Sequence, residues 1–101
     1  MNVFDEVAKE MVRGSRMHGP LGTCDGVPIP SHPSAVLREF SQDLERAARL
    51  DLAEAPTIAA IFAEECGEAL TAGSEAARRV ELIQVAAVAL HWVAWIDSNA
   101  R

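Results

Sequence analysis

Acidic and amide side chains recur at helical spacing in the second half of the chain, and they are the residues best suited to chemistry: Glu64, Glu65, Glu68, Glu81 and Gln84. Glu65 lies seven residues after Ile58, so at about 100° per residue both point to the same side of a helix. Glu68 and Ile61 are related in the same way. Since the apolar residues mark the buried side, we expect both acids to face the protein interior.

The next helix also carries polar residues on its apolar side. Glu81 lies in line with three apolar residues, Val85, Val88 and Trp92, and Gln84 shares that side. Carboxylates that meet near an apolar core repel one another and lose hydration, so they either keep a proton or bind a cation. No lysine or arginine lies among the inward positions of these two helices. The pattern therefore predicts a Mg²⁺ site with oxygen ligands, the alternative being an ordinary solvated helix face.

Four helices are predicted to position these groups, because alanine, leucine and glutamate dominate the composition and tyrosine is absent. We expect them over residues 2–13, 35–55, 58–72 and 75–98, the first ending at Gly14. Thr57 and Ser74 are typical N-caps of the last two helices, and Gly73 suits the left-handed position that ends a helix. The short link between these two helices predicts that they are antiparallel neighbours.

Residues 14–33 are rich in glycine and proline, and we predict that they form an irregular loop within a single domain spanning residues 1–101. Prolines at positions 20, 28, 30 and 33 exclude a helix there. A stretch of this length without regular structure is long for a compact domain, so it is either a functional loop or a mobile one.

The composition limits the classes of partner. Half of the 101 residues are hydrophobic, which excludes a disordered chain, and the net charge of −6 argues against a nucleic-acid polymer as partner. Two distant cysteines favour a reducing compartment. Acidic residues interrupt any apolar start, and the longest apolar stretch, residues 82–96, is short for a membrane span. We therefore expect a soluble, cytoplasmic protein with no membrane partner.

The fourth predicted helix indicates self-association. Between Val85 and Ile96 it is apolar on nearly every side, and three other helices in so small a chain can hardly cover it. We therefore predict an all-α fold, a small antiparallel bundle of about four helices that is completed in a homodimer or tetramer.

The acidic pattern also resembles that of a known family. The run Glu64-Glu65-Cys66-Gly67-Glu68 is followed, after twelve residues, by a run that begins Glu81-Leu82-Ile83-Gln84. This arrangement is similar to the E-x-x-E and E-x-x-D motifs of the MazG-like all-α nucleoside triphosphate pyrophosphohydrolases. The resemblance extends over residues 57–97, and Gln84 departs from it by replacing the last acid.

The resemblance implies an enzyme that depends on Mg²⁺, or on Mn²⁺ in its place, and cleaves a nucleoside triphosphate to a monophosphate and pyrophosphate. It implies metal ligands at Glu65, Glu68, Glu81 and Gln84, and a water-orienting catalytic base at Glu64. Because Gln84 offers a neutral oxygen, the alternative is a catalytically weak or inactive helical module that binds nucleotide or a protein partner.

Such a substrate also needs positive charge and a pocket for its base. Arg78 and Arg79 are close in sequence to Glu81 and are candidates for phosphate binding, although a solvated pair is the alternative. Arg46 and Arg49 on the second predicted helix allow the same two interpretations. The segment 14–33 is a candidate lid over the base, with a structural or disordered loop as the alternative.

Overall fold

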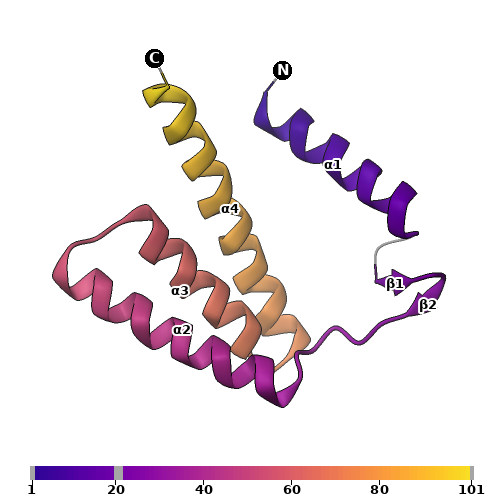
Figure 1. Ribbon diagram of the computed structural model, residues 1–101, viewed down its shortest axis with the longest axis horizontal. Coiled ribbons are helices and arrows are strands. Elements are labelled where there is room, and N and C mark those ends of the chain that lie inside the picture. The colour runs from indigo at the N-terminus through magenta and orange to yellow at the C-terminus, as the bar shows by residue number, and fades with distance from the viewer. Residues whose placement is uncertain (1, 20–21, 101) are drawn as a thin grey trace. The chain divides into compact units, whose positions relative to one another are not determined.

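The computed structural model describes residues 2–19 and 22–100, which form four helices and one short hairpin (Figure 1). The elements are α1 (Val3–His18), β1 (Thr23–Cys24), β2 (Val27–Pro28), α2 (Ala35–Glu54), α3 (Ile58–Thr71) and α4 (Glu75–Asn99). The predicted all-α class is confirmed. The chain divides into two compact units, Met1–Ser31 and His32–Arg101.

The first unit contains α1, which is longer than predicted. The side chain of Asn2 caps the helix by accepting a hydrogen bond from the Asp5 N–H (2.9 Å). The helix then continues through Gly14 to His18, so the predicted end at residue 13 is wrong. An isolated glycine costs a helix only about 1 kcal/mol relative to alanine. Arg13 forms an ion pair with Glu10 on the same helix (2.8 Å), and such pairs support helix.

A short hairpin follows α1, so residues 14–33 are not irregular throughout. β1 pairs with β2 in antiparallel register around Asp25 and Gly26, which have φ angles of 50° and 79°. Positive φ at both central residues is the geometry of the tight hairpin turns that Asp-Gly favours. The Asp25-Gly26 dipeptide was therefore the signal for this hairpin in the sequence.

Each helix of the second unit begins at a hydroxyl cap. The cap oxygen accepts a hydrogen bond from the backbone N–H three residues later: Ser34 from Leu37 (3.2 Å), Thr57 from Ala60 (3.0 Å) and Ser74 from Ala77 (3.1 Å). These bonds satisfy N–H groups that have no partner within the helix. The N-caps predicted at Thr57 and Ser74 are confirmed.

The connection between α3 and α4 differs from its prediction. Gly73 is not among the residues with positive φ, and Ala72 leaves the helix with φ −55° and ψ 141°. Arg78 takes over the capping role, because its guanidinium donates to the carbonyls of Ala69 (3.0 Å) and Ala72 (3.1 Å). A basic side chain that satisfies the last carbonyls of a helix is an alternative to a left-handed glycine.

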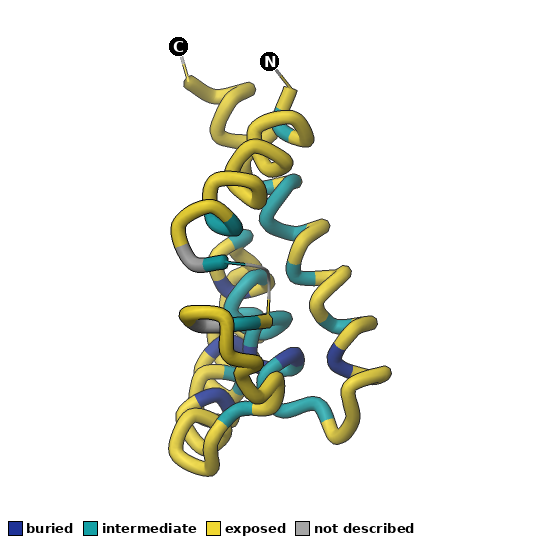
Figure 2. The backbone as a smooth tube through the Cα atoms, turned by 90° about the vertical axis from the view of Figure 1, so that its right-hand side faces the viewer, coloured by how far each residue is buried: buried dark blue, intermediate teal, exposed yellow. Residues whose placement is uncertain are grey.

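In the second unit α3 lies between α2 and α4 and packs against both (Figure 1). The buried apolar residues are all alanines, Ala48, Ala60 and Ala69, and no large side chain is fully buried among the described residues. Buried positions are accordingly sparse along the chain (Figure 2). Burial of small side chains contributes little stabilising free energy, since that energy scales with the apolar area removed from water.

Large apolar side chains remain exposed on both outer helices of this unit. On α2 they include Leu37, Phe40 and Leu44, at the three- and four-residue spacing of one helix face. In the most apolar 18-residue window of α4 no residue is fully buried within this chain, although several are half-buried. By length and composition α4 would also suit a membrane span, which is a weak indication because core helices of soluble proteins pass the same test.

Candidate metal centre

Three carboxylates converge between α3 and α4. Glu65 and Glu68 come from α3 and Glu81 from α4, and one oxygen of each lies within 4.8 Å of the others. All three side chains are half-buried. The convergence predicted from the helical spacing of these acids is therefore confirmed.

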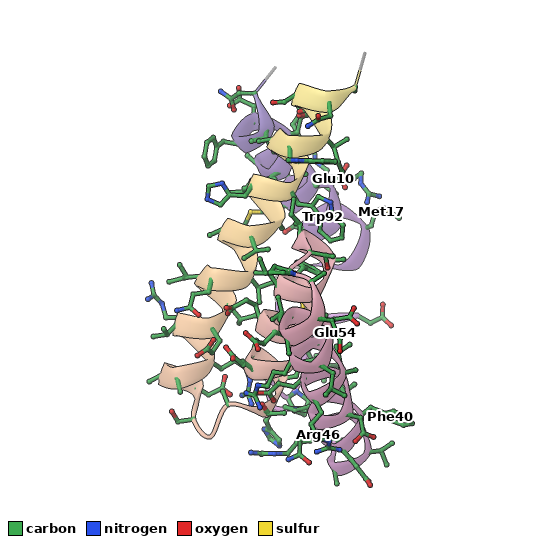
Figure 3. All side chains as sticks on the ribbon, turned by 90° about the vertical axis from the view of Figure 1, so that its left-hand side faces the viewer. Glu10, Met17, Phe40, Arg46, Glu54 and Trp92 are labelled. Atoms are coloured by element: carbon green, nitrogen blue, oxygen red, sulfur yellow. The ribbon has the colours of Figure 1, made fainter. Side chains whose placement is uncertain are left out.

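The register between α3 and α4 is fixed on both sides of these acids. Toward one end, Arg78 of α4 is bonded to the last turn of α3, as described above. Toward the other, Phe62 of α3 meets Trp92 of α4 edge to face, with ring centroids 5.7 Å apart (Figure 3 labels Trp92). Glu65 and Glu68 lie between Phe62 and the carbonyls that Arg78 caps, so the two contacts together hold them opposite Glu81.

Gln84 bridges two of the acids. Because its amide faces carboxylate oxygens, the orientation that pairs donor with acceptor directs the amide nitrogen toward them. In that orientation Nε2 donates to Glu65 Oε2 (2.9 Å) and to Glu81 Oε2 (3.0 Å). The amide nitrogen, rather than the carbonyl oxygen expected for a metal ligand, therefore faces this pair.

The crowding of these carboxyls changes their acidity. Burial raises the pKa of Glu65, and the negative charges of Glu81 and Glu64 raise it further. Burial, followed by the charge of Glu65, raises the pKa of Glu68 to about 7. The ionised cluster is therefore short of compensating charge near neutral pH, which a proton or a cation would supply.

Arg49 of α2, one of the two arginines on this helix considered from the sequence, provides a positive charge at the cluster. Its Nε lies 3.5 Å from Glu64 Oε2, and its Nη2 lies 3.9 Å from Glu68 Oε1. The prediction that no arginine neutralises the acids considered only α3 and α4, and it is wrong because α2 supplies one. Glu64, the predicted catalytic base, thus lies beside a cation at the margin of the cluster.

The two arginines predicted to reach phosphates, Arg78 and Arg79, differ in burial. Arg78 is buried, and its Nε, Nη1 and Nη2 are bonded to Ala69, Glu75 and Ala72 respectively. Its guanidinium therefore joins α3 to α4, and this placement does not support the predicted phosphate contact. Arg79 is exposed on α4.

The donor set suits a hard divalent cation. Oxygens bound to one Mg²⁺ at about 2.1 Å lie no more than about 4.2 Å apart, so oxygens within 4.8 Å need only small side-chain rotations. Burial and the neighbouring carboxylates raise the pKa of Glu65 and of Glu68, so a bound cation would favour their ionised forms. The chemistry and spacing of Glu65, Glu68 and Glu81 therefore fit such an ion.

Comparison of the chain with protein-family models, characterised proteins and solved structures gives no significant match.

Proposed function

We propose that this protein is a MazG-like nucleoside triphosphate pyrophosphohydrolase that depends on Mg²⁺ or Mn²⁺. The single observation that carries the proposal is the convergence of Glu65, Glu68 and Glu81 between two antiparallel helices. Converging carboxylates with raised pKa values favour a divalent cation, and such a cation lets an acidic protein bind a polyphosphate.

Each acid has a proposed role. Glu65, Glu68 and Glu81 would hold the metal ion, which when bound supplies charge neutralisation at the phosphates and lowers the pKa of a coordinated water. Glu64 lies one residue before Glu65 on the side toward α2, and it would orient the attacking water as general base. The products would be a nucleoside monophosphate and pyrophosphate.

Gln84 supports a second candidate function, that of a nucleotide-binding module with weak or no turnover. Its amide places a neutral donor where the family motif has a carboxylate, so the site has one negative charge fewer. Metal affinity decreases when the number of charged ligands is reduced. Gln84 would then preserve the arrangement of Glu65 and Glu81 through hydrogen bonds instead of metal coordination.

A second copy of the chain is the proposed partner, in a homodimer or tetramer that remains cytoplasmic. The apolar residues buried within the second unit are alanines, while large apolar side chains on α2 and α4 are exposed. A patch of this kind on a small chain is typical of a subunit interface. Glu81 and Gln84 lie within α4 and contact α3 acids, which favours a protein partner over lipid for this helix.

The test is pyrophosphate release from a panel of nucleoside triphosphates with Mg²⁺ or Mn²⁺. We expect the parent chain to release pyrophosphate from at least one nucleotide and Glu65→Gln to abolish release. Glu54→Gln, which removes an exposed acid at the end of α2, is the matched control and should retain activity. Nucleotide binding without release would favour the second candidate function, and the absence of both metal and nucleotide binding would refute the two together.

A further inference from the structure

We propose that Arg49 of α2 binds the polyphosphate of the substrate at this site, an inference that rests on the proposed function. Arg49 lies at the margin of the acidic cluster, within ion-pair distance of Glu64 (3.5 Å) and Glu68 (3.9 Å). From the sequence alone Arg49 and Arg46 were equivalent candidates, but the two arginines have different surroundings in the structure.

The guanidinium of Arg49 is held by Glu45 through Nη2, while much of the side chain is exposed to solvent. Its Nη2 bonds to Glu45 Oε1 at 2.5 Å, and Glu45 is mostly buried, with 14% of its side chain exposed. The hydroxyl of Thr71 of α3, which also contacts the Gly67 carbonyl at 2.8 Å, lies 3.3 Å from the other carboxylate oxygen of Glu45. Glu45 is thus held between α2 and α3, and it orients the guanidinium toward the cluster.

The contacts of Arg49 with the cluster are loose by comparison. Distances of 3.5 and 3.9 Å exceed those of a strong charge-assisted hydrogen bond. The arginine side chain is 56% exposed, and a guanidinium carries five N–H donors in a planar fork. Donors not taken by Glu45 therefore remain available to a phosphate that approaches from solvent.

Charge balance shows why the site needs such a group. Glu64, Glu65, Glu68 and Glu81 carry four negative charges when ionised, and one divalent cation cancels two. The remaining charge would still repel a triphosphate. If Glu68 were bound to a metal ion, its long ion pair with Arg49 would break. Glu45 would still hold the guanidinium of Arg49, which could then bind the phosphates.

Arg46 offers a matched control. It lies on the same helix and is 65% exposed, but its ion-pair partner is Asp43 on the same helix, which is 59% exposed. The variants to compare are Arg49→Gln, Arg49→Lys and Arg46→Gln. Binding of Mn²⁺ alone, binding of inorganic tripolyphosphate with Mn²⁺, and steady-state hydrolysis of the best nucleotide are the measurements.

We expect Arg49→Gln to raise KM and weaken tripolyphosphate binding about 10- to 100-fold, with a smaller change in kcat. Its Mn²⁺ affinity should stay equal or increase, because a competing cation is lost. Arg49→Lys, which keeps the charge but not the fork, should lie between Arg49→Gln and the parent. Arg46→Gln should match the parent in every measurement.

The outcomes separate the two claims. If the parent hydrolyses nucleotides but Arg49→Gln behaves like Arg46→Gln, or loses Mn²⁺ affinity together with phosphate affinity, the inference is wrong and the proposed function stands. If Arg49→Gln does not fold, an unchanged KM in a folded Arg49→Lys overturns the inference. If the parent binds neither Mn²⁺ nor nucleotide, the proposed function fails and this inference fails with it.

Discussion

Gly67 of α3 lies directly against Glu45 of α2. A Cβ atom at Gly67 would lie 2.9 Å from Glu45 Cβ, closer than real Cβ contacts allow, and 3.0 Å from the Ser41 carbonyl oxygen, tighter than most such contacts. This approach sets the distance and register between the two helices. Because Arg49 follows Glu45 by one helical turn, the same approach places Arg49 beside Glu64 and Glu68.

Gly67→Ala should therefore destabilise the second unit by about 1–3 kcal/mol, since the added methyl group forces α2 and α3 apart. In a domain of this size each kcal/mol lowers the melting temperature by about 4–8 °C. Thermal unfolding followed by circular dichroism measures the change. Gly14→Ala is the control: Gly14 lies in α1 with no atom near its Cβ position, so alanine there should leave stability unchanged or increase it.

The distinction between local and long-range information explains what the sequence could predict. The caps at Thr57 and Ser74 and the convergence of Glu65 with Glu68 depend on residues a few positions apart, and both were predicted correctly. Glu81 could be predicted to lie near Glu65 and Glu68 because the short link between α3 and α4 makes these helices antiparallel neighbours. The position of Arg49 depends on how α2 and α3 are aligned at Gly67. A helical wheel describes one helix at a time, so it cannot predict this alignment.

Two local expectations about glycines failed, each for a different reason. Gly73 was expected to end α3 in a left-handed conformation, but Arg78 satisfies the terminal carbonyls from six residues beyond Ala72. The same bonds remove Arg78 from the phosphate-binding candidates. Gly14 was expected to end α1, but the cost of one glycine is small beside the helix around it.

The first pH prediction concerns the metal-free protein. The pKa of Glu68 is about 7 in the folded chain, above its ordinary value of 4.5, so the folded state binds more protons than the unfolded state between these pH values. The free energy of unfolding should therefore decrease as pH rises from about 4.5 to 7 and level off above. A pKa shift of this size is worth up to about 3 kcal/mol before solvent screening reduces it, and each kcal/mol lowers the melting temperature by about 4–8 °C, so we expect a fall of at least about 4–8 °C over this range. A Glu68→Gln variant that shows the same decrease as the parent would contradict this assignment, and Glu54→Gln controls for the loss of one acid.

Metal binding should have the opposite pH dependence. A divalent cation binds the ionised carboxylates, so it must displace the proton that Glu68, with a pKa of about 7, retains near neutral pH, and the raised pKa of Glu65 acts in the same direction. We expect Mg²⁺ affinity, measured by calorimetry in buffers of different ionisation enthalpy, to increase at least about tenfold between pH 6 and 8 with proton release. The stabilisation by excess Mg²⁺ should grow over the same range. Affinity that is constant with pH would show that these carboxyls do not hold the ion.

Gln84→Asp should restore the missing charge of the site. A fourth carboxylate near Glu65 and Glu81 should tighten Mg²⁺ binding about tenfold and increase pyrophosphate release, because ligand charge governs affinity for this ion. The same change should lower the melting temperature of the metal-free protein, since it replaces a hydrogen-bond donor by a like charge. Gln42→Asp, on the exposed surface of α2, adds the same charge away from the site and should change neither property.

The proposed oligomer is tested at Phe40, which is 67% exposed and points away from α3 (Figure 3). Together with Leu37 and Leu44, which are partly exposed, it forms an apolar face on α2 that the other helices of the second unit leave open to solvent. Phe40→Glu should place a charge in the interface and shift the protein toward the monomer in sedimentation velocity experiments, by at least about tenfold in dissociation constant. Gln42→Glu adds the same charge two residues away, outside this face, and should leave association intact.

Because the apolar core within one chain consists of alanines, we also expect the melting temperature of the parent to rise with protein concentration, and that of Phe40→Glu to be lower at every concentration. A parent chain that sediments as a monomer with a concentration-independent melting temperature would rule out the second copy as the partner of this face.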